Sequence, residues 1–95
     1  MAIVVQTLVP HASEADADRL DQLVNAAIMQ RGAPPAGLMA HVCHPSADGF
    51  MIYEVWRSEA DMQPFYDEVV LPNLAEAGLV PDAPVVSPVW SFARP

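Results

Sequence analysis

The sequence predicts a single α+β domain of the ferredoxin-like type, with the element order β-α-β-β-α-β and a four-stranded antiparallel sheet. Ninety-five residues fit one domain, spanning 1–95, and leave no room for two. Short β-branched runs alternate with two stretches of helical periodicity. The strands are apolar on both faces, although two right-handed crossovers cover only one face of such a sheet.

The first half of the chain predicts a strand, a helix and a second strand. Residues 2–9 (AIVVQTLV) are β-branched and apolar, which is typical of a strand. Ser13 and Asp16 form a capping-box pattern, and Gly32 is a stop signal, so a helix is expected between them. Its apolar stripe consists of Ala17, Leu20, Val24, Ala27 and Ile28. Residues 37–43 (GLMAHVC) follow as the second strand.

The second half predicts a hairpin, another helix and an edge strand. The Asp48-Gly49 pair indicates a turn before a third strand at 50–57. Ser58 caps the next helix, which places Met62, Phe65 and Val69 on its inner side and ends at Gly78. Pro72 is expected to kink or split that helix. The last strand covers 85–93, and Pro88 within it argues for an edge position.

Charge and cysteine content exclude several classes of function. The net charge is −8, with four arginines and no lysine, so binding to nucleic acid or to an anionic membrane is not expected. Cys43 is the single cysteine, so no intrachain disulfide can form. No segment approaches the roughly 20 apolar residues that cross a bilayer. We therefore expect a soluble cytoplasmic protein.

The apolar character of both sheet faces predicts a homodimer. On the third strand, Phe50, Ile52 and Trp56 share one face, while Met51, Tyr53 and Val55 share the other. The helices can cover one of these faces. A second copy, packed sheet against sheet, is the simplest cover for the other.

The segment from Gly49 to Gly78 resembles the antibiotic biosynthesis monooxygenase-like superfamily. The resemblance lies in the string Glu54-Val55-Trp56-Arg57-Ser58, in Phe65, and in the pairs Leu71-Pro72 and Ala77-Gly78. It implies a dimeric α/β barrel with a pocket between helices and sheet in each subunit. It also implies a cofactor-independent monooxygenase acting on a small planar aromatic or polyketide-type compound, with no cofactor. The alternative is a non-catalytic protein that binds a small ligand or serves as an accessory factor.

The haem-degrading branch of that superfamily does not fit this sequence. That branch uses an asparagine on the first strand, a tryptophan within the second helix and a histidine near its end. The corresponding positions here are Gln6 or Thr7, Phe65 and Ala75. Haem degradation is therefore not expected.

Glu54 and His41 are the residues predicted to carry catalysis. Glu54 is the one charge within an apolar strand, where poor solvation would raise its pKa and let it act as a general base. The alternative is an ion pair with Arg57, Arg94 or an arginine of a partner subunit. His41 could serve as a proton shuttle.

Aromatic and apolar residues are expected to line the ligand pocket. The set comprises Tyr53, Trp56, Phe65, Tyr66 and Val69. The string His41-Val42-Cys43-His44 invites a metal interpretation, but only residues two apart share a strand face. His41 then pairs with Cys43 while His44 points away, so no metal site is expected.

Overall fold

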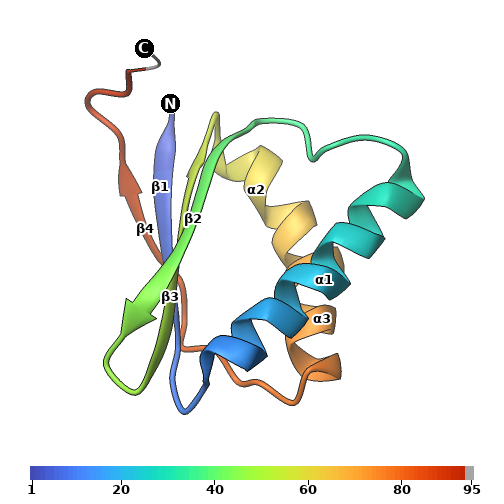
Figure 1. Ribbon diagram of the computed structural model, residues 1–95. Coiled ribbons are helices and arrows are strands. Elements are labelled where there is room, and N and C mark those ends of the chain that lie inside the picture. The colour runs from blue at the N-terminus through green and yellow to red at the C-terminus, as the bar shows by residue number, and fades with distance from the viewer. Residues whose placement is uncertain (94–95) are drawn as a thin grey trace.

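The structure, a computed structural model, describes residues 1–93 and has the predicted element order (Figure 1). Strand β1 (Ile3–Val9) leads into helix α1 (Glu14–Arg31), and strands β2 (Leu38–Ser46) and β3 (Gly49–Trp56) form a hairpin. A second helical segment consists of α2 (Glu59–Phe65), η1 (Tyr66–Val70) and α3 (Leu71–Glu76). Strand β4 (Val85–Pro88) completes an antiparallel sheet of order β2-β3-β1-β4. The ferredoxin-like fold is confirmed.

The signals at the two ends of α1 act as predicted. The Ser13 side chain accepts a hydrogen bond from the Asp16 backbone amide, and the Asp16 carboxylate accepts one from the Ser13 amide. These two bonds satisfy amide groups that have no partner within the helix. At the other end Gly32 has φ 79°, a left-handed conformation that glycine adopts without strain.

The β2–β3 hairpin turns one residue earlier than predicted. Ser46 pairs with Gly49, so Ala47 and Asp48 form the turn, and Ala47 takes the positive φ of 50°. Gly49 belongs to β3 and is not part of the turn. A Cβ at this position would lie 1.9 Å from the Val9 carbonyl oxygen. Close approach of β1 and β3, rather than turn geometry, requires glycine at this position.

The helices cover one face of the sheet (Figure 1). Along β1 the buried side chains alternate, with Ile3, Val5, Thr7 and Val9 facing the helices. The remaining core residues come from β3, from both helical segments and from the connection after α3. They are Leu20, Phe50, Ile52, Trp56, Met62, Phe65, Tyr66, Val69, Val70, Leu74 and Leu79.

The opposite face of the sheet carries apolar side chains with no cover in the described part of the chain. Val4 pairs with Val55, and Leu8 pairs with Met51, on either side of the Gln6–Tyr53 pair across β1 and β3. The Tyr53 ring stacks on His44 of β2, with ring centroids 5.2 Å apart. The predicted division of the β3 side chains between two apolar faces is therefore present in the structure.

The second helical segment is irregular, but the irregularity precedes Pro72. Residues 66–70 form a π-helical turn in which the Leu71 amide donates to the Tyr66 carbonyl, and Pro72 lies in the first turn of α3. Proline lacks the amide that would continue an α-helical ladder, and a π-turn accommodates this without ending the helix. The wider turn lets Tyr66, Val69 and Val70 all lie in the buried part of the molecule.

The last strand, β4, is shorter than predicted but lies at the predicted edge of the sheet. Strand β4 ends at Pro88 instead of residue 93, because it pairs with only four residues of β1. Its edge position, predicted from Pro88, is confirmed.

Within residues 1–93, no helix has both the length and the apolar character needed to cross a membrane.

Candidate functional site

A cavity of about 800 Å³ lies between α1 and the helix-covered face of the sheet. Its apolar wall comes from α1, β3 and the second helical segment, through Leu20, Val24, Ile28, Ile52 and Phe65. The cavity exists because α1 stands away from the sheet. Leu20 is its one fully buried residue, its other apolar residues pack only partly against the core, and the helix contacts α3, η1 and β3. A volume of this size fits a small organic ligand.

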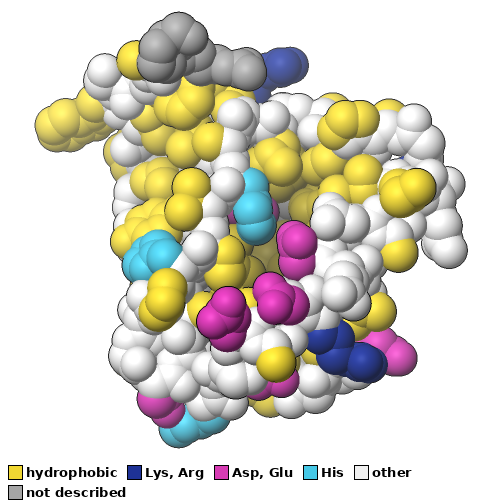
Figure 2. All heavy atoms as spheres, in the orientation of Figure 1, with side chains coloured by type: hydrophobic (Ala, Val, Ile, Leu, Met, Phe, Trp, Pro, Cys, Tyr) yellow, Lys and Arg dark blue, Asp and Glu magenta, His cyan; other side chains and the backbone are white. Residues whose placement is uncertain are grey.

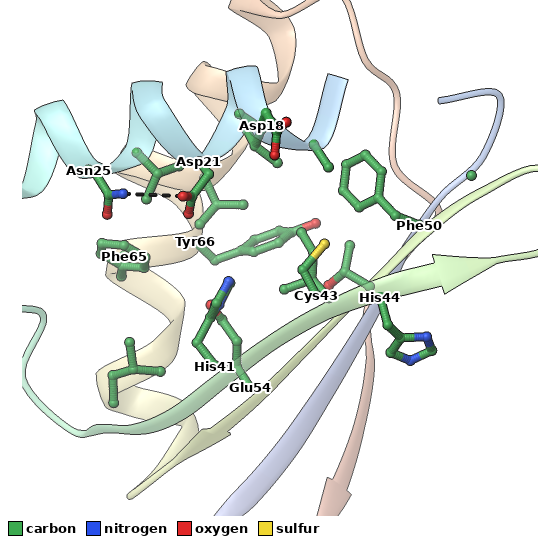
Figure 3. Close-up of a pocket in the computed structure, with 18 of the residues that line it drawn as sticks. Asp18, Asp21, Asn25, His41, Cys43, His44, Phe50, Glu54, Phe65 and Tyr66 are labelled. Atoms are coloured by element: carbon green, nitrogen blue, oxygen red, sulfur yellow. Dashed lines mark hydrogen bonds and ion pairs between the residues drawn. The ribbon is translucent and has the colours of Figure 1, made fainter. Parts of the chain in front are cut away.

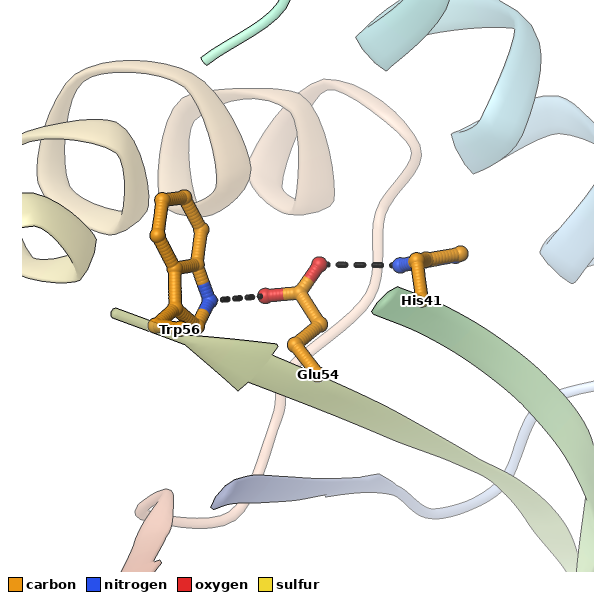
Figure 4. Close-up of polar contacts among 3 residues, drawn as sticks. All are labelled: His41, Glu54 and Trp56. Carbon is orange, nitrogen blue, oxygen red and sulfur yellow. Dashed lines mark hydrogen bonds and ion pairs between the residues drawn. The ribbon is translucent and has the colours of Figure 1, made fainter. Parts of the chain in front are cut away.

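A polar pair and an indole lie on one side of this cavity (Figure 4). The Nδ1 atom of His41 on β2 lies 2.8 Å from Glu54 Oε2 on β3. The Trp56 indole N–H donates to the other carboxylate oxygen, Oε1, at 3.1 Å. Glu54 and Trp56 are two residues apart on β3 and therefore share its inner face. Both oxygens of the carboxylate are thus engaged by neighbouring side chains.

The hydrogen bond to Glu54 raises the pKa of the His41 imidazole above 6.5. Burial acts in the opposite direction, while the negative charges of Glu54 and Asp21 add to the increase. The Glu54 side chain is 12% exposed and that of His41 is 45% exposed, so the histidine is the partner that solvent or a ligand can reach. Because Nδ1 is bonded to Glu54, Nε2 is the ring nitrogen left to exchange a proton.

Helix α1 supplies an acidic rim, which we define as Glu14, Asp18 and Asp21. These residues follow one another at four- and three-residue steps and line the cavity. Figure 2 shows acidic side chains and a histidine gathered around a hollow between β2 and α1. Burial, together with the charges of Asp21 and Asp18, raises the pKa of the Cys43 thiol on the opposite wall.

Two hydroxyl groups line the inner part of the cavity. Tyr66 is 9% exposed, and its ring points from η1 into the cavity (Figure 3). Thr7 of β1 is 3% exposed and is the one buried polar residue among those described. Neither hydroxyl makes a side-chain hydrogen bond with another residue of the described chain. Burial raises the pKa of the Tyr66 phenol, so the group stays a neutral donor.

Four of the seven residues predicted for the site line this cavity, namely His41, Glu54, Phe65 and Tyr66. Glu54 forms its ionic contact with His41 instead of Arg57, and Arg94 lies outside the described residues.

The other three predicted pocket residues do not line this cavity. Tyr53 belongs to the opposite face of the sheet, where it stacks on His44. Trp56 is fully buried beneath the cavity wall and reaches the site only through its N–H bond to Glu54. Val69 is buried in the core.

Several residues of the cavity were not predicted, among them Thr7, Asp18 and Asp21. Thr7 could have been found, because it is the polar member of an otherwise apolar series on the inner face of β1. Asp18 and Asp21 border the apolar stripe of α1, and a sequence pattern does not show that α1 stands away from the sheet at this point.

The strand geometry expected for the His41–His44 segment is present. His41, Cys43 and His44 all border the cavity, but the His44 ring points away from it (Figure 3). Among residues 1–93, no group of three or more His, Cys, Asp or Glu side chains is arranged to hold a metal ion.

Comparisons with known proteins support the fold. No family model and no curated protein sequence matches this chain. The solved structures that it resembles include SnoaB, a cofactor-independent oxygenase from Streptomyces nogalater. The TM-score is 0.63 and the sequence identity is 13%, and the match covers 96% of this chain and 94% of that one. Another is a monooxygenase from the gene ActVA-Orf6 of Streptomyces coelicolor, in complex with Nanaomycin D. The TM-score is 0.61 and the sequence identity is 22%, and the match covers 99% of this chain and 91% of that one.

A third similar structure is NE2512, a protein of unknown function from Nitrosomonas europaea, with a TM-score of 0.59 and 15% identity over 99% of this chain and 93% of that one. The resemblance to the monooxygenase-like superfamily is confirmed at the level of the fold. At these identities the comparison carries over neither a substrate nor an activity.

Proposed function

We propose that this protein binds a small planar aromatic compound and catalyses its oxygenation without a metal or flavin. The observation that carries the proposal is the cavity of about 800 Å³, with apolar walls and a His41–Glu54 pair. A substrate-sized cavity with a proton-accepting group is what such a reaction needs. The fold is shared with a cofactor-independent oxygenase, which supports the same reaction class.

His41 is the proposed base and Glu54 its positioning residue. With Nδ1–H donated to Glu54, the Nε2 atom of neutral His41 can remove a proton from a phenol or from an activated CH₂ group. The resulting anion is electron-rich and reduces O₂. For a CH₂ group the balance is one CH₂ and one O₂ giving one C=O and one H₂O, so the substrate itself is the reductant. Glu54 is less suited to be the base, because both of its oxygens already accept hydrogen bonds.

Replacing His41 with asparagine should lower the rate of this reaction by about 10²- to 10⁴-fold, the range for loss of a general base. The assay is O₂ uptake with a planar carbon acid such as anthrone, together with product detection, since anthrone also autoxidises slowly. Gln63→Asn, on the exposed side of α2, is the matched control. Ligand binding with no O₂ uptake by the wild type would contradict catalysis and leave a binding protein, the alternative considered from the sequence.

The rate should rise with pH, with a midpoint above 6.5. The His41 pKa is raised, and only the neutral imidazole accepts a proton, so activity is low below that pKa and reaches a plateau above it. Glu54→Gln removes the main cause of the increase. Its midpoint should therefore move down towards 6.5. A midpoint that does not change in Glu54→Gln would contradict the pairing as the determinant of the pH profile.

We also propose that the uncovered face of the sheet binds a second copy of the chain. The face is largely apolar across β1 and β3, where Val4 pairs with Val55 and Leu8 with Met51, with Gln6 beside Tyr53 between them. A stable interface buries about 800 Å² on each partner. Packing of two such faces would remove the apolar surface from water.

Val55→Glu should convert the dimer to a species near 10.3 kDa, because it places a charge on the apolar face. Sedimentation at micromolar concentration measures the change. Gln22→Glu adds the same charge on the exposed surface of α1 and should leave the dimer intact. A wild-type chain that sediments as a monomer would contradict the proposed assembly.

A further inference from the structure

The inner part of the cavity and its mouth carry different polar groups, and both affect which ligand the cavity binds. The inner part offers the hydroxyls of Thr7 and Tyr66, and the mouth carries the acidic rim on α1. This inference rests on the proposed binding of an aromatic compound and concerns which members of that class are preferred.

The two hydroxyls indicate that the ligand presents an oxygen to the inner part of the cavity. Both side chains are more than nine-tenths buried, and neither makes a side-chain hydrogen bond within the described chain. No side-chain oxygen of the described chain is both fully buried and unpartnered, so the two hydroxyl oxygens are open to the cavity and a ligand can reach them and supply a partner. A phenolic hydroxyl or a carbonyl on a planar ring would supply it.

The acidic rim favours a positive charge at the mouth. Asp21 makes one side-chain hydrogen bond, with Asn25 at 3.4 Å, and its charge also acts on the His41 imidazole, whereas Asp18 has no hydrogen-bond or ion-pair partner among the described side chains. The arginines of the described chain do not line the cavity. Two carboxylates near the opening attract a cation and repel an anion, an effect increased by the net charge of −8.

We propose that the cavity selects a planar hydroxylated aromatic compound that also carries a protonated amine. The ring oxygen hydrogen-bonds to Thr7 and Tyr66, the ring lies among Leu20, Val24, Ile28 and Ile52, and the ammonium group lies at Asp18 and Asp21. A carboxylate in place of the amine is rejected.

Three naphthols that differ only in the substituent on the second ring test the charge preference. Calorimetric titration compares an unsubstituted, an aminomethyl and a carboxylate compound at pH 7 and low salt. The aminomethyl compound should bind about two- to thirtyfold more tightly than the unsubstituted one, and the carboxylate compound should bind more weakly by a similar factor. The expected factors are modest because an exposed charge pair contributes little to the free energy of binding. The differences should shrink as salt screens the rim.

The double variant Asp18→Asn/Asp21→Asn should remove this order, and both substitutions lie on the exposed surface of α1, where amides are tolerated. Glu76→Gln on α3, which removes an acidic group away from the cavity, should keep it. Equal affinity for all three compounds in the wild type, or an order that persists in the double variant, would overturn the charge preference while leaving aromatic binding intact. Failure of all three to bind would overturn the proposed function as well.

The oxygen contacts are tested with the aminomethyl compound and its counterpart without the hydroxyl. Tyr66→Phe and Thr7→Val should each weaken binding of the hydroxylated compound by about two- to tenfold, the range for one hydrogen bond. Neither should affect the compound that lacks the hydroxyl. An equal loss for both compounds would show a packing defect and overturn the assignment of the two hydroxyls.

Discussion

Replacing Trp56 with alanine should lower the free energy of unfolding by about 3–5 kcal/mol, the range for truncating a large buried aromatic side chain. Trp56 is fully buried and packs against Phe65, with ring centroids 5.7 Å apart. Alanine removes these contacts, leaves a void, and deprives Glu54 Oε1 of its indole donor. A domain of this size has a total stability of about 5–15 kcal/mol, so this substitution removes a large part of it.

Trp56→Phe separates packing from hydrogen bonding. It keeps an aromatic ring in the core but removes the N–H, so we expect a loss of about 1–3 kcal/mol. Urea denaturation of all three proteins at one protein concentration measures both values, since unfolding of an assembled protein depends on concentration. A loss below about 1 kcal/mol in the alanine variant would show that Trp56 is not the packing centre that its burial indicates.

Gly49→Ala should cost about 3 kcal/mol or more, although it adds one methyl group. The new Cβ would lie 1.9 Å from the Val9 carbonyl oxygen and 2.9 Å from Pro10 Cα, both backbone atoms. No side-chain rotation relieves this contact, so β1 and β3 must move apart, and overpacking of this kind is strongly destabilising.

Gly32→Ala is the matched comparison for that substitution. Gly32 has φ 79° and no atom within 4 Å of a built Cβ, so alanine there meets conformational strain alone, about 1 kcal/mol. Thermal unfolding should therefore rank wild type above Gly32→Ala, and Gly32→Ala above Gly49→Ala. A Gly49→Ala protein as stable as Gly32→Ala would contradict the close strand approach.

Much of the fold follows from local patterns that the structure confirms. Ser13 with Asp16, and Gly32, determine the ends of α1 because they satisfy backbone groups that any helix leaves free. Alternation along β3 separates Trp56 and Glu54 from Tyr53. That same alternation already implied that Tyr53 and Trp56 could not line one cavity, so their joint prediction was inconsistent with the strand geometry.

The site was less predictable because its geometry depends on distances between elements. Glu54 and His41 lie opposite each other in the β2–β3 register, and that register depends on a turn which the Asp48-Gly49 signal misplaced by one residue. The cavity depends on how far α1 stands from the sheet, which results from its packing on α3, η1 and β3. The π-turn that brings Tyr66 to this space has no signature in the sequence other than the nearby prolines.

The distance between α1 and the sheet also has a consequence for local unfolding. Helix α1 fully buries only Leu20, while Ala17, Val24, Ala27 and Ile28 pack partly against the core, so its backbone amides should exchange with solvent at a lower free energy than those of β1 and β3. A molecule that occupies the cavity would give Val24 and Ile28 a further surface to pack against. A bound ligand would then slow the exchange of the backbone amide hydrogens of α1 in particular. Hydrogen exchange in this helix would therefore show whether the cavity is occupied.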